Sequence, residues 1–377
     1  MAVYLDYNAS APIDSRVLSR MVDVYQNHFG NADSRTHVFG TDAKEIVSSS
    51  RKTIADILQV DSTDVLFTSG ATESNNMATL GLLDYALETG RNHFITTSIE
   101  HKSILEAMKY LEKKGCNVEF VSPDSSGRIR PEQILDRVTD RTALVSMMHV
   151  NSETGIIQPI EEVGNALDRT KVLFHIDATQ GFGKLNSSLR NTKYSMLSFT
   201  AHKLGGPQGI GAIVLRRDRT YHRPPIKQIM FGGQQERGYR PGTTPVALVA
   251  GFALAAELCD KESAENHEKC KAIKDSFLSS INGLHYSING AQEYCLPSTI
   301  NISFHGVDAE GIFLAIKDDY AFSNGSACTS GSHKPSYVLT AMGLDDARIN
   351  EAVRISWNQN TVVDFSSLVY YIKSITE

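Results

Sequence analysis

Two reactive side chains, an amine and a thiol, stand out in this sequence of 377 residues. Lys203 ends the stretch Ser-Phe-Thr-Ala-His-Lys and is followed by the glycine-rich run Leu-Gly-Gly-Pro-Gln-Gly. Cys328 lies in Ser-Asn-Gly-Ser-Ala-Cys-Thr-Ser, among small, turn-forming residues that cannot pack a core. An amine suited to a Schiff base and a thiol suited to nucleophilic attack predict covalent chemistry in two stages.

Other polar side chains follow apolar runs that have the length of strands. Asp177 ends one such run, and burial of a carboxylate is costly unless it pairs with a cation or a hydrogen-bond donor. A pyridinium N–H is one such partner, and a structural ion pair explains Asp177 equally well when it is taken alone. The segment 68–74 opens a predicted helix, where backbone N–H groups could bind a phosphate, although Ser and Thr also cap ordinary helices.

His101 and Asn151 follow two further apolar runs. Each has an ordinary structural explanation, as a hydrogen-bonded histidine or as an amide that caps a loop. Beside a cofactor, an imidazole could instead stack on an aromatic ring and relay protons near neutral pH. The order of phosphate loop, histidine, asparagine, aspartate and lysine along the chain has no single structural explanation.

The elements that position these residues alternate between about residues 64 and 216. Seven apolar runs have the length of strands, and the segments 103–113 and 159–167 between them have helical periodicity. This alternation predicts an α/β fold with a mainly parallel sheet, in which ligands bind beyond the carboxyl ends of the strands. The predicted strands are 65–68, 94–98, 118–121, 143–149, 172–177, 196–199 and 212–215.

The pattern changes after a predicted helix at 246–261. The charged segment 262–271 predicts an exposed helical turn, and a smaller α+β pattern follows it. A chain of this length favours more than one domain. We therefore predict a large domain over 14–255 and a small domain made of 1–13 and 256–377. The predicted strands of the small domain are 299–304 and 353–357, and its helices are 309–317, 336–342 and 363–375.

Composition excludes several classes of protein. The net charge is -6 with both signs mixed along the chain, which argues against direct binding of a nucleic acid backbone. Five cysteines without a CxxC pair argue against a disulfide framework or a zinc site and favour a reducing cytoplasm. We expect no secretory signal and no membrane span, because the longest apolar stretch, 246–258, is too short to cross a bilayer.

These motifs together resemble those of the cysteine desulfurases, pyridoxal-phosphate (PLP) enzymes of the class V aminotransferase group. The resemblance runs from Tyr-Leu-Asp-Tyr-Asn-Ala at 4–9 to Arg-Ile-Ser at 354–356. It includes Asp-Ala-Thr-Gln at 177–180, His-Lys at 202–203 and Gly-Ser-Ala-Cys-Thr-Ser at 325–330. It implies the fold type I of PLP-dependent transferases, with a large domain around a mainly parallel seven-stranded sheet and a smaller α+β domain.

The resemblance also implies which residues hold the cofactor ring. Lys203 would form the Schiff base with PLP, Asp177 would pair with the pyridine nitrogen, and His101 would stack on the ring. Gln180 and Asn151 would address the ring oxygen, with Asn151 also near the substrate.

The cofactor phosphate and the substrate carboxylate would have separate partners. A guanidinium suits a carboxylate because it can donate two parallel hydrogen bonds. The residues implied for the phosphate are Ala71, Thr72, Thr200 and His202, with Thr243 reaching the neighbouring subunit of a homodimer, and those for the carboxylate are Arg354 and Asn31.

The implied reaction converts L-cysteine to L-alanine and transfers the sulfur to Cys328 as a persulfide, then to an acceptor protein. Lys203, with His101 as an additional candidate, would remove the Cα proton. The motif around Cys328 resembles the branch that serves iron–sulfur assembly, in which Cys328 could also ligate a shared cluster. The motif Ser-Arg-Thr-His at 34–37 and the compact C-terminus look more like desulfurases that feed DNA phosphorothioate modification.

Two other classes of function remain open at this point. The chain could be a sulfur-relay or adaptor protein, in which docking matters more than turnover. It could also catalyse another PLP reaction, such as transamination or β-elimination, which would give a keto product or pyruvate instead of alanine.

Overall fold

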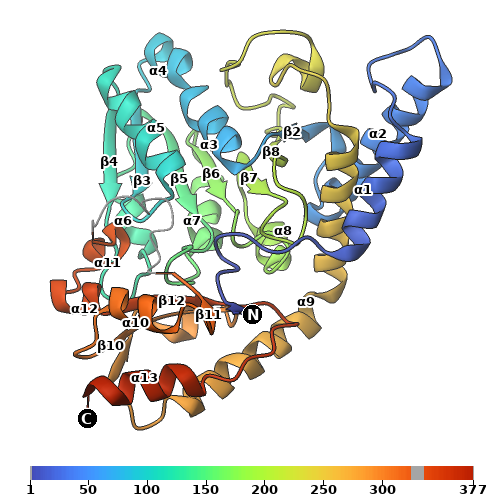
Figure 1. Cartoon of the computed structure of the whole chain (residues 1–377). Coiled ribbons are helices and arrows are strands. Elements are labelled where there is room, and N and C mark those ends of the chain that lie inside the picture. The colour runs from blue at the N-terminus through green and yellow to red at the C-terminus, as the bar shows by residue number, and fades with distance from the viewer. Residues whose placement is uncertain (1, 324–334, 377) are drawn as a thin grey trace.

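A seven-stranded sheet forms the centre of the larger part of the molecule in the computed structural model, which describes residues 2–323 and 335–376 (Figure 1). The strand order is β2-β8-β7-β6-β5-β3-β4, and β8 runs opposite to the other six strands of this described sheet. The mainly parallel sheet predicted from the sequence is confirmed, with every strand end within one residue of its predicted place. Its strands are β2 (Val65–Thr68), β3 (His93–Thr97), β4 (Asn117–Val121), β5 (Thr142–Met148), β6 (Leu173–Asp177), β7 (Met196–Thr200) and β8 (Gly211–Leu215).

Both faces of this sheet are covered, which explains why its strands read as continuous apolar runs. Along β2, Val65 and Phe67 point into one hydrophobic cluster and Leu66 into another, because successive side chains of a strand alternate between faces. The first face is covered by α1 (Ser15–Asn27), α2 (Val38–Leu58), α7 (Ile160–Leu167), α8 (Asn186–Asn191) and the start of α9, and the second by α3 (Ala71–Leu80), α4 (Leu83–Thr89) and α5 (Lys102–Lys113).

Helix α9 (Val246–Ser280) is continuous over 35 residues, so the separate helical turn predicted at 262–271 is wrong. Its first part packs in the core beside the sheet, and Cys270 and Phe277 near its end pack in a second core. Between the two cores the helix is largely exposed, and i,i+4 ion pairs such as Lys269–Glu265 (2.6 Å) favour the helical conformation there. The charged composition reflects exposure, not the end of the helix.

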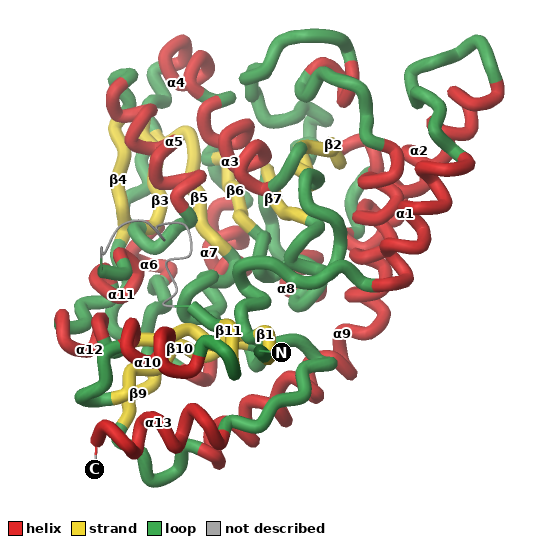
Figure 2. The backbone as a smooth tube through the Cα atoms, in the orientation of Figure 1, coloured by secondary structure: helices red, strands yellow, loops and turns green. Residues whose placement is uncertain are grey.

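The second core lies against a three-stranded antiparallel sheet, β12-β10-β9, and a short parallel pair of β1 with β11 (Figure 2). Leu5, next to β1, packs in this core with Trp357 and Phe277, so the N-terminal segment joins the C-terminal part of the chain. The elements are β1 (Val3–Tyr4), β9 (Tyr286–Ile288), β10 (Thr299–Phe304), β11 (Tyr320–Ala321), β12 (Ala352–Ser356), α10 (Ala309–Ile316), α11 (Tyr337–Ala341), α12 (Asp346–Asn350) and α13 (Ser366–Thr376), and α6 (Pro131–Leu135) precedes β5. Each helix in 2–323 and 335–376 is too short or too polar for a bilayer span.

Candidate active site

The carboxyl ends of β2, β3, β5, β6 and β7 lie at one edge of the sheet, because these strands run in the same direction. The residues that follow them are the ones predicted to bind a cofactor. β6 ends at Asp177, and β7, its neighbour, ends at Thr200 and leads to His202 and Lys203. His101 follows β3 as the N-cap of α5, and Asn151 follows β5.

Asp177 is 4% exposed and receives two hydrogen bonds. Asn75 Nδ2 donates to Asp177 Oδ2 (2.7 Å), and the Thr179 N–H donates to Asp177 Oδ1 (2.9 Å). Among the described residues no Lys, Arg or His forms an ion pair with this carboxylate, so the structural ion pair considered for Asp177 has no cation there. A buried carboxylate with only neutral donors suits a positively charged partner such as a protonated pyridine nitrogen.

His101 belongs to the same hydrogen-bond network through Ser103. The Ser103 N–H donates to His101 Nδ1 (3.1 Å), and Ser103 Oγ lies 2.8 Å from the same nitrogen. Asn75 Nδ2 reaches Ser103 Oγ as well (2.9 Å). Because Nδ1 accepts from the backbone, the neutral ring carries its proton on Nε2. Asn75 and Ser103 were not predicted from the sequence, although a polar residue on the buried face of a helix was a signal for Asn75.

Lys203 is held by the N-terminal segment of the chain. Its Nζ donates to the carbonyl oxygens of Asn8 (2.5 Å) and Ala9 (2.6 Å), and Gln180 Nε2 donates to the same Asn8 oxygen (2.9 Å). Gly205, two residues later, has a φ of 75° that favours glycine in the turn. No residue pattern around Lys203 indicates the two carbonyl groups, which lie about 195 residues away along the chain.

Four of the five residues predicted to hold a phosphate, all but Thr243, lie at the start of α3 or at the end of β7. Gly70, with a φ of 155°, is the N-cap, and a Cβ there would lie 3.8 Å from Thr200 Oγ1. That hydroxyl lies 3.0 Å from His202 Nδ1. Burial, and secondarily the charge of Lys203, lowers the pKa of His202 to about 4, so its ring is neutral at neutral pH. The first-turn N–H groups of α3, at Ala71 and Thr72, complete a set of donors typical of phosphate sites.

Asn151 has its amide engaged within its own loop. Its Oδ1 accepts from the N–H groups of Glu153 and Thr154 (both 2.9 Å), and its Nδ2 donates to Ile99 O (3.1 Å). The loop-capping explanation is therefore realised, and contact with a cofactor ring or substrate stays a prediction for Asn151.

Arg354, on β12, is 2% exposed. Its Nη2 donates to Asp6 Oδ1 (2.5 Å) and Ser323 Oγ (3.1 Å), and its Nη1 donates to Ser152 O (3.1 Å). Asn31 and Thr243 are exposed, and neither side chain hydrogen-bonds to another predicted site residue in the described part of the chain. Cys328 lies outside the described residues.

A buried carboxyl group next to His101 was also not assigned a role from the sequence. Burial raises the pKa of Glu100 to about 8, although Thr97 Oγ1 (2.6 Å) and the Met148 N–H (2.9 Å) donate to its Oε1. Glu100 therefore keeps its proton at neutral pH.

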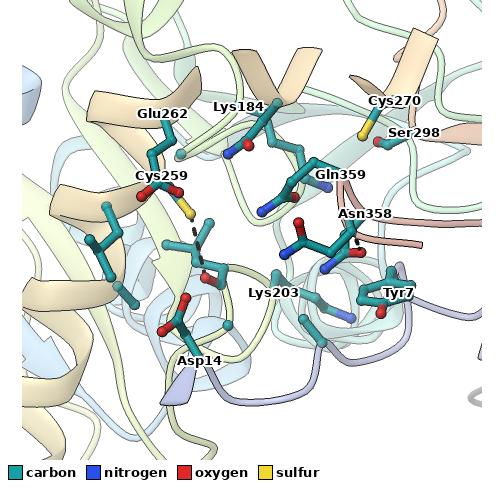
Figure 3. Close-up of a pocket in the computed structure, with 18 of the residues that line it drawn as sticks. Tyr7, Asp14, Lys184, Lys203, Cys259, Glu262, Cys270, Ser298, Asn358 and Gln359 are labelled. Carbon is teal, nitrogen blue, oxygen red and sulfur yellow. Dashed lines mark hydrogen bonds between the residues drawn. The ribbon is translucent and has the colours of Figure 1, made fainter. Parts of the chain in front are cut away.

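The donor set at this edge fits pyridoxal phosphate: a lysine, a buried carboxylate with neutral donors, an imidazole and a phosphate cradle. Of the predicted site residues in the described ranges, only Lys203 also lines a separate cavity of about 370 Å³ between the two cores (Figure 3). That cavity therefore adjoins the predicted cofactor site at Lys203, and its lining contains no other described residue predicted for that site.

Comparison with known proteins gives a consistent result. A model of the family described as Aminotransferase class-V matches residues 3–364. The chain is 40% identical to the cysteine desulfurase IscS of Pasteurella multocida (strain Pm70) over 364 residues, covering 96% of this chain and 89% of the relative. It is 38% identical to the mitochondrial cysteine desulfurase of Eremothecium gossypii, covering 100% of this chain and 75% of that protein.

Two solved structures have the same fold. DndA from Streptomyces lividans has a TM-score of 0.83 at 40% identity and covers 93% of this chain and 98% of that chain. The structure described as SspA in complex with cysteine has a TM-score of 0.84 at 34% identity, with 96% of this chain and 100% of that chain covered.

Proposed function

Because this chain belongs to the class-V aminotransferase family and is a PLP-dependent cysteine desulfurase, we propose that the residues at the carboxyl edge of its sheet form the active site. The observation that carries the proposal is the pairing of β6 with β7, which puts Asp177 and Lys203 at neighbouring strand ends. Asp177 would hold the protonated ring nitrogen and Lys203 the cofactor aldehyde carbon. Thr200, His202 and the first turn of α3 would hold the phosphate.

When bound, the cofactor supplies an electron sink for bond changes at the substrate Cα. The chain supplies orientation and proton transfer. Lys203 Nζ, held near the site by the Asn8 and Ala9 carbonyl groups, would take the proton from Cα. His101, with its proton on Nε2, would cover the ring and is a second proton carrier. Overall, the Cβ–S bond of L-cysteine would break and an S–S bond between its sulfur and the Cys328 thiolate would form. Cβ would take up a proton in place of the sulfur and Cα would regain the proton that it lost, which gives L-alanine.

Arg354 would bind the substrate carboxylate. Its guanidinium is already oriented by Asp6, Ser323 and the Ser152 carbonyl, which reduces the entropy lost when a carboxylate binds. Asn31 would assist from a loop between α1 and α2, and it remains exposed within this single chain.

We propose a homodimer as the active unit. An exposed apolar surface on α1, α2 and the loop between them includes Tyr25, Phe29 (69% exposed), Val38 (72%) and Phe39. Surfaces of this kind mark interfaces between proteins. A second copy of the chain would cover this surface, and the Thr243 of each subunit would then reach the cofactor phosphate in the other subunit.

The loop that leads to Thr243 is well held for such a role. Arg51 makes two contacts of 2.6 Å with the Glu236 carboxylate, which also accepts from the Phe67 N–H (2.9 Å). Glu236 and Arg237 have φ values of 45° and 60°, a strained conformation that these contacts stabilise. Mixing a Lys203→Ala chain with a Thr243→Ala chain tests this: one of the two sites in a mixed dimer would be intact, so activity returns only if Thr243 acts across subunits.

The acceptor of the sulfur is proposed to belong to DNA phosphorothioate modification. The similarity to the DndA structure and the motif at 34–37 support this acceptor over one in iron–sulfur cluster assembly. Labelled sulfur from L-[³⁵S]cysteine, followed to the protein that receives it in the source cell, distinguishes the two. Label on a cluster scaffold, and not on a phosphorothioation protein, contradicts the proposal.

We also propose the division into a large domain, 14–255, and a small domain, 1–13 with 256–377. The separate hydrophobic cores support it, since the first contains Val17 to Ala256 and the second contains Leu5 and residues from Cys270 onward. We further propose a cytoplasmic location, because a reducing compartment keeps thiols free. Four cysteines, Cys116, Cys259, Cys270 and Cys295, form no disulfide with one another.

Product analysis tests the activity directly. Purified enzyme with L-cysteine should release L-alanine in step with sulfide or persulfide. Pyruvate would select β-elimination, a keto acid would select transamination, and full partner complementation by Lys203→Ala would select an adaptor role.

A further inference from the structure

The cavity of about 370 Å³ lies where α9 leaves one hydrophobic core and enters the other (Figure 3). Cys259 on α9 packs against the first core, and Cys270 belongs to the second. The opposite walls come from the N-terminal segment 7–16 and from the residues that follow β12. A molecule in this cavity would contact both parts of the chain, and the volume is within the range of small-molecule sites.

The carboxylates that line the cavity have ion-pair partners, whereas the Lys184 ammonium group has none among the described residues. Its two carboxylates, Asp14 and Glu262, both pair with Arg16, at 2.8 and 2.7 Å. No carboxylate of the described residues lies within ion-pair distance of the Lys184 ammonium group. Its Nζ donates a long hydrogen bond to Gln180 Oε1 (3.4 Å). Burial lowers the pKa of Lys184, as expected for an ammonium group without a counter-ion.

Neutral polar groups line the same cavity. Ser298 Oγ is buried and has no hydrogen-bond partner among the described residues. Asn358, Gln359 and Asn360 lie on the wall formed after β12, and in the view of Figure 3 the Asn358 and Gln359 side chains appear between Lys184 and Lys203. A buried hydroxyl group without a partner is costly, and a polar ligand atom would remove that cost.

Much of the remaining lining is apolar, and it includes the single tryptophan of the chain, Trp357. Two other cationic side chains of the lining already have partners: Arg16 pairs with both carboxylates, and Lys203 Nζ donates to the Asn8 and Ala9 carbonyl oxygens. A dianion such as phosphate is therefore disfavoured, because Lys184 would supply most of the positive charge. A single negative charge on an apolar body matches the lining better. The apolar lining residues include Ile13, Leu204, Leu258, Leu296 and Trp357.

We propose that this cavity is a second ligand site, which takes a small organic carboxylate with an apolar body. The carboxylate binds Lys184, with Ser298 and the amides near Asn358 as further donors, and the body lies against Leu258 and Trp357. This site differs from the proposed substrate site, where Arg354 binds the carboxylate of L-cysteine. It does not depend on which acceptor receives the sulfur.

Binding of sodium octanoate to the PLP-loaded enzyme tests the proposal. Octanamide has the same shape without the charge, and acetate has the charge without the apolar body. Calorimetry should give one octanoate per chain, with a change in Trp357 fluorescence, and at least tenfold weaker binding of the other two probes. No octanoate binding, or equal binding of octanoate and octanamide, overturns the proposal.

Two variants locate the site. Lys184→Met keeps the apolar stem and should weaken octanoate binding at least tenfold, whereas Lys171→Met, at an exposed lysine, should bind as the unmodified enzyme does. Leu258→Trp should fill the cavity and also block binding, with the visible cofactor band of both variants reporting an intact fold. If folded Lys184→Met or folded Leu258→Trp binds octanoate as well as the unmodified enzyme does, the ligand binds elsewhere and the inference is contradicted. Inhibition by octanoate that is competitive with L-cysteine contradicts it as well.

Discussion

Arg354 and Asp6 form an ion pair of 2.5 Å between residues that are 348 positions apart in the sequence. The guanidinium is almost fully buried, and the carboxylate comes from the N-terminal segment that also holds Lys203 through Asn8 and Ala9. One short segment therefore orients both the proposed carboxylate-binding group and the proposed cofactor lysine.

Removal of Asp6 should weaken substrate binding more than turnover. In Asp6→Ala the Arg354 guanidinium loses its charged acceptor, and such a hydrogen bond contributes about 1.5–3 kcal/mol. We expect KM for L-cysteine to rise about tenfold with kcat changed less than threefold. Asp6→Asn keeps an acceptor and should have a smaller effect. Steady-state kinetics of both variants, with the exposed Asp23→Ala as a control, check this, and a loss confined to kcat would contradict it.

Lys203 and Cys328 should separate two stages of the reaction. Lys203→Ala should lose the visible absorption band of the bound cofactor and all alanine formation. Cys328→Ser should keep the band and lose at least a hundredfold of the sulfur transfer, because a hydroxyl group is a poor nucleophile toward sulfur. Absorption spectra and a persulfide assay measure the two properties. A Cys328→Ser enzyme that still forms a protein persulfide would show that another thiol accepts the sulfur.

Asn75 should support cofactor binding through Asp177. Its Nδ2 donates to a carboxylate oxygen at 2.7 Å, and loss of a charge-assisted hydrogen bond in Asn75→Ala should weaken cofactor affinity about tenfold. Asn76→Ala is the matched control, since the Asn76 amide donates to Thr72 O and not to Asp177. Titration of each apo variant with PLP gives the affinities. Equal PLP affinities of Asn75→Ala and Asn76→Ala would show that Asn75 does not support cofactor binding.

The buried Glu100 should make stability depend on pH. Its pKa is raised to about 8 in the folded chain from 4.5, so between these values the folded state binds a proton that the unfolded state has lost. The free energy of unfolding should therefore fall with increasing pH, by at most about 1.4 kcal/mol per pH unit from this group.

Glu100→Gln keeps an oxygen that can accept from Thr97 and Met148 but cannot ionise. We expect the variant to be less sensitive to pH than the unmodified enzyme and to exceed its stability at pH 9. Chemical denaturation of both proteins at pH 5, 7 and 9 measures the difference. Parallel pH profiles would show that Glu100 ionises as it does in water.

Several parts of the molecule could be predicted because they depend on local composition. β5 and β7 are buried on both faces, and a strand of this kind needs an unbroken apolar run that is visible in the sequence. The helical continuation at 262–271 was missed because an exposed helix between two cores has the same charged composition as a surface turn. Its continuity is decided by the cores that hold α9 at both ends.

The sequence alone determined the identity and order of the groups proposed to react: a predicted phosphate loop, His101, Asp177 and Lys203, each following an apolar strand. The neighbours that orient them were decided by tertiary structure. Asn75 meets Asp177, Asn8 and Ala9 meet Lys203, and Asp6 meets Arg354 only after the sheet and the N-terminal segment have assembled. The physical reason is that a hydrogen bond between distant residues depends on the positions of both backbones, which no local pattern of residue types records.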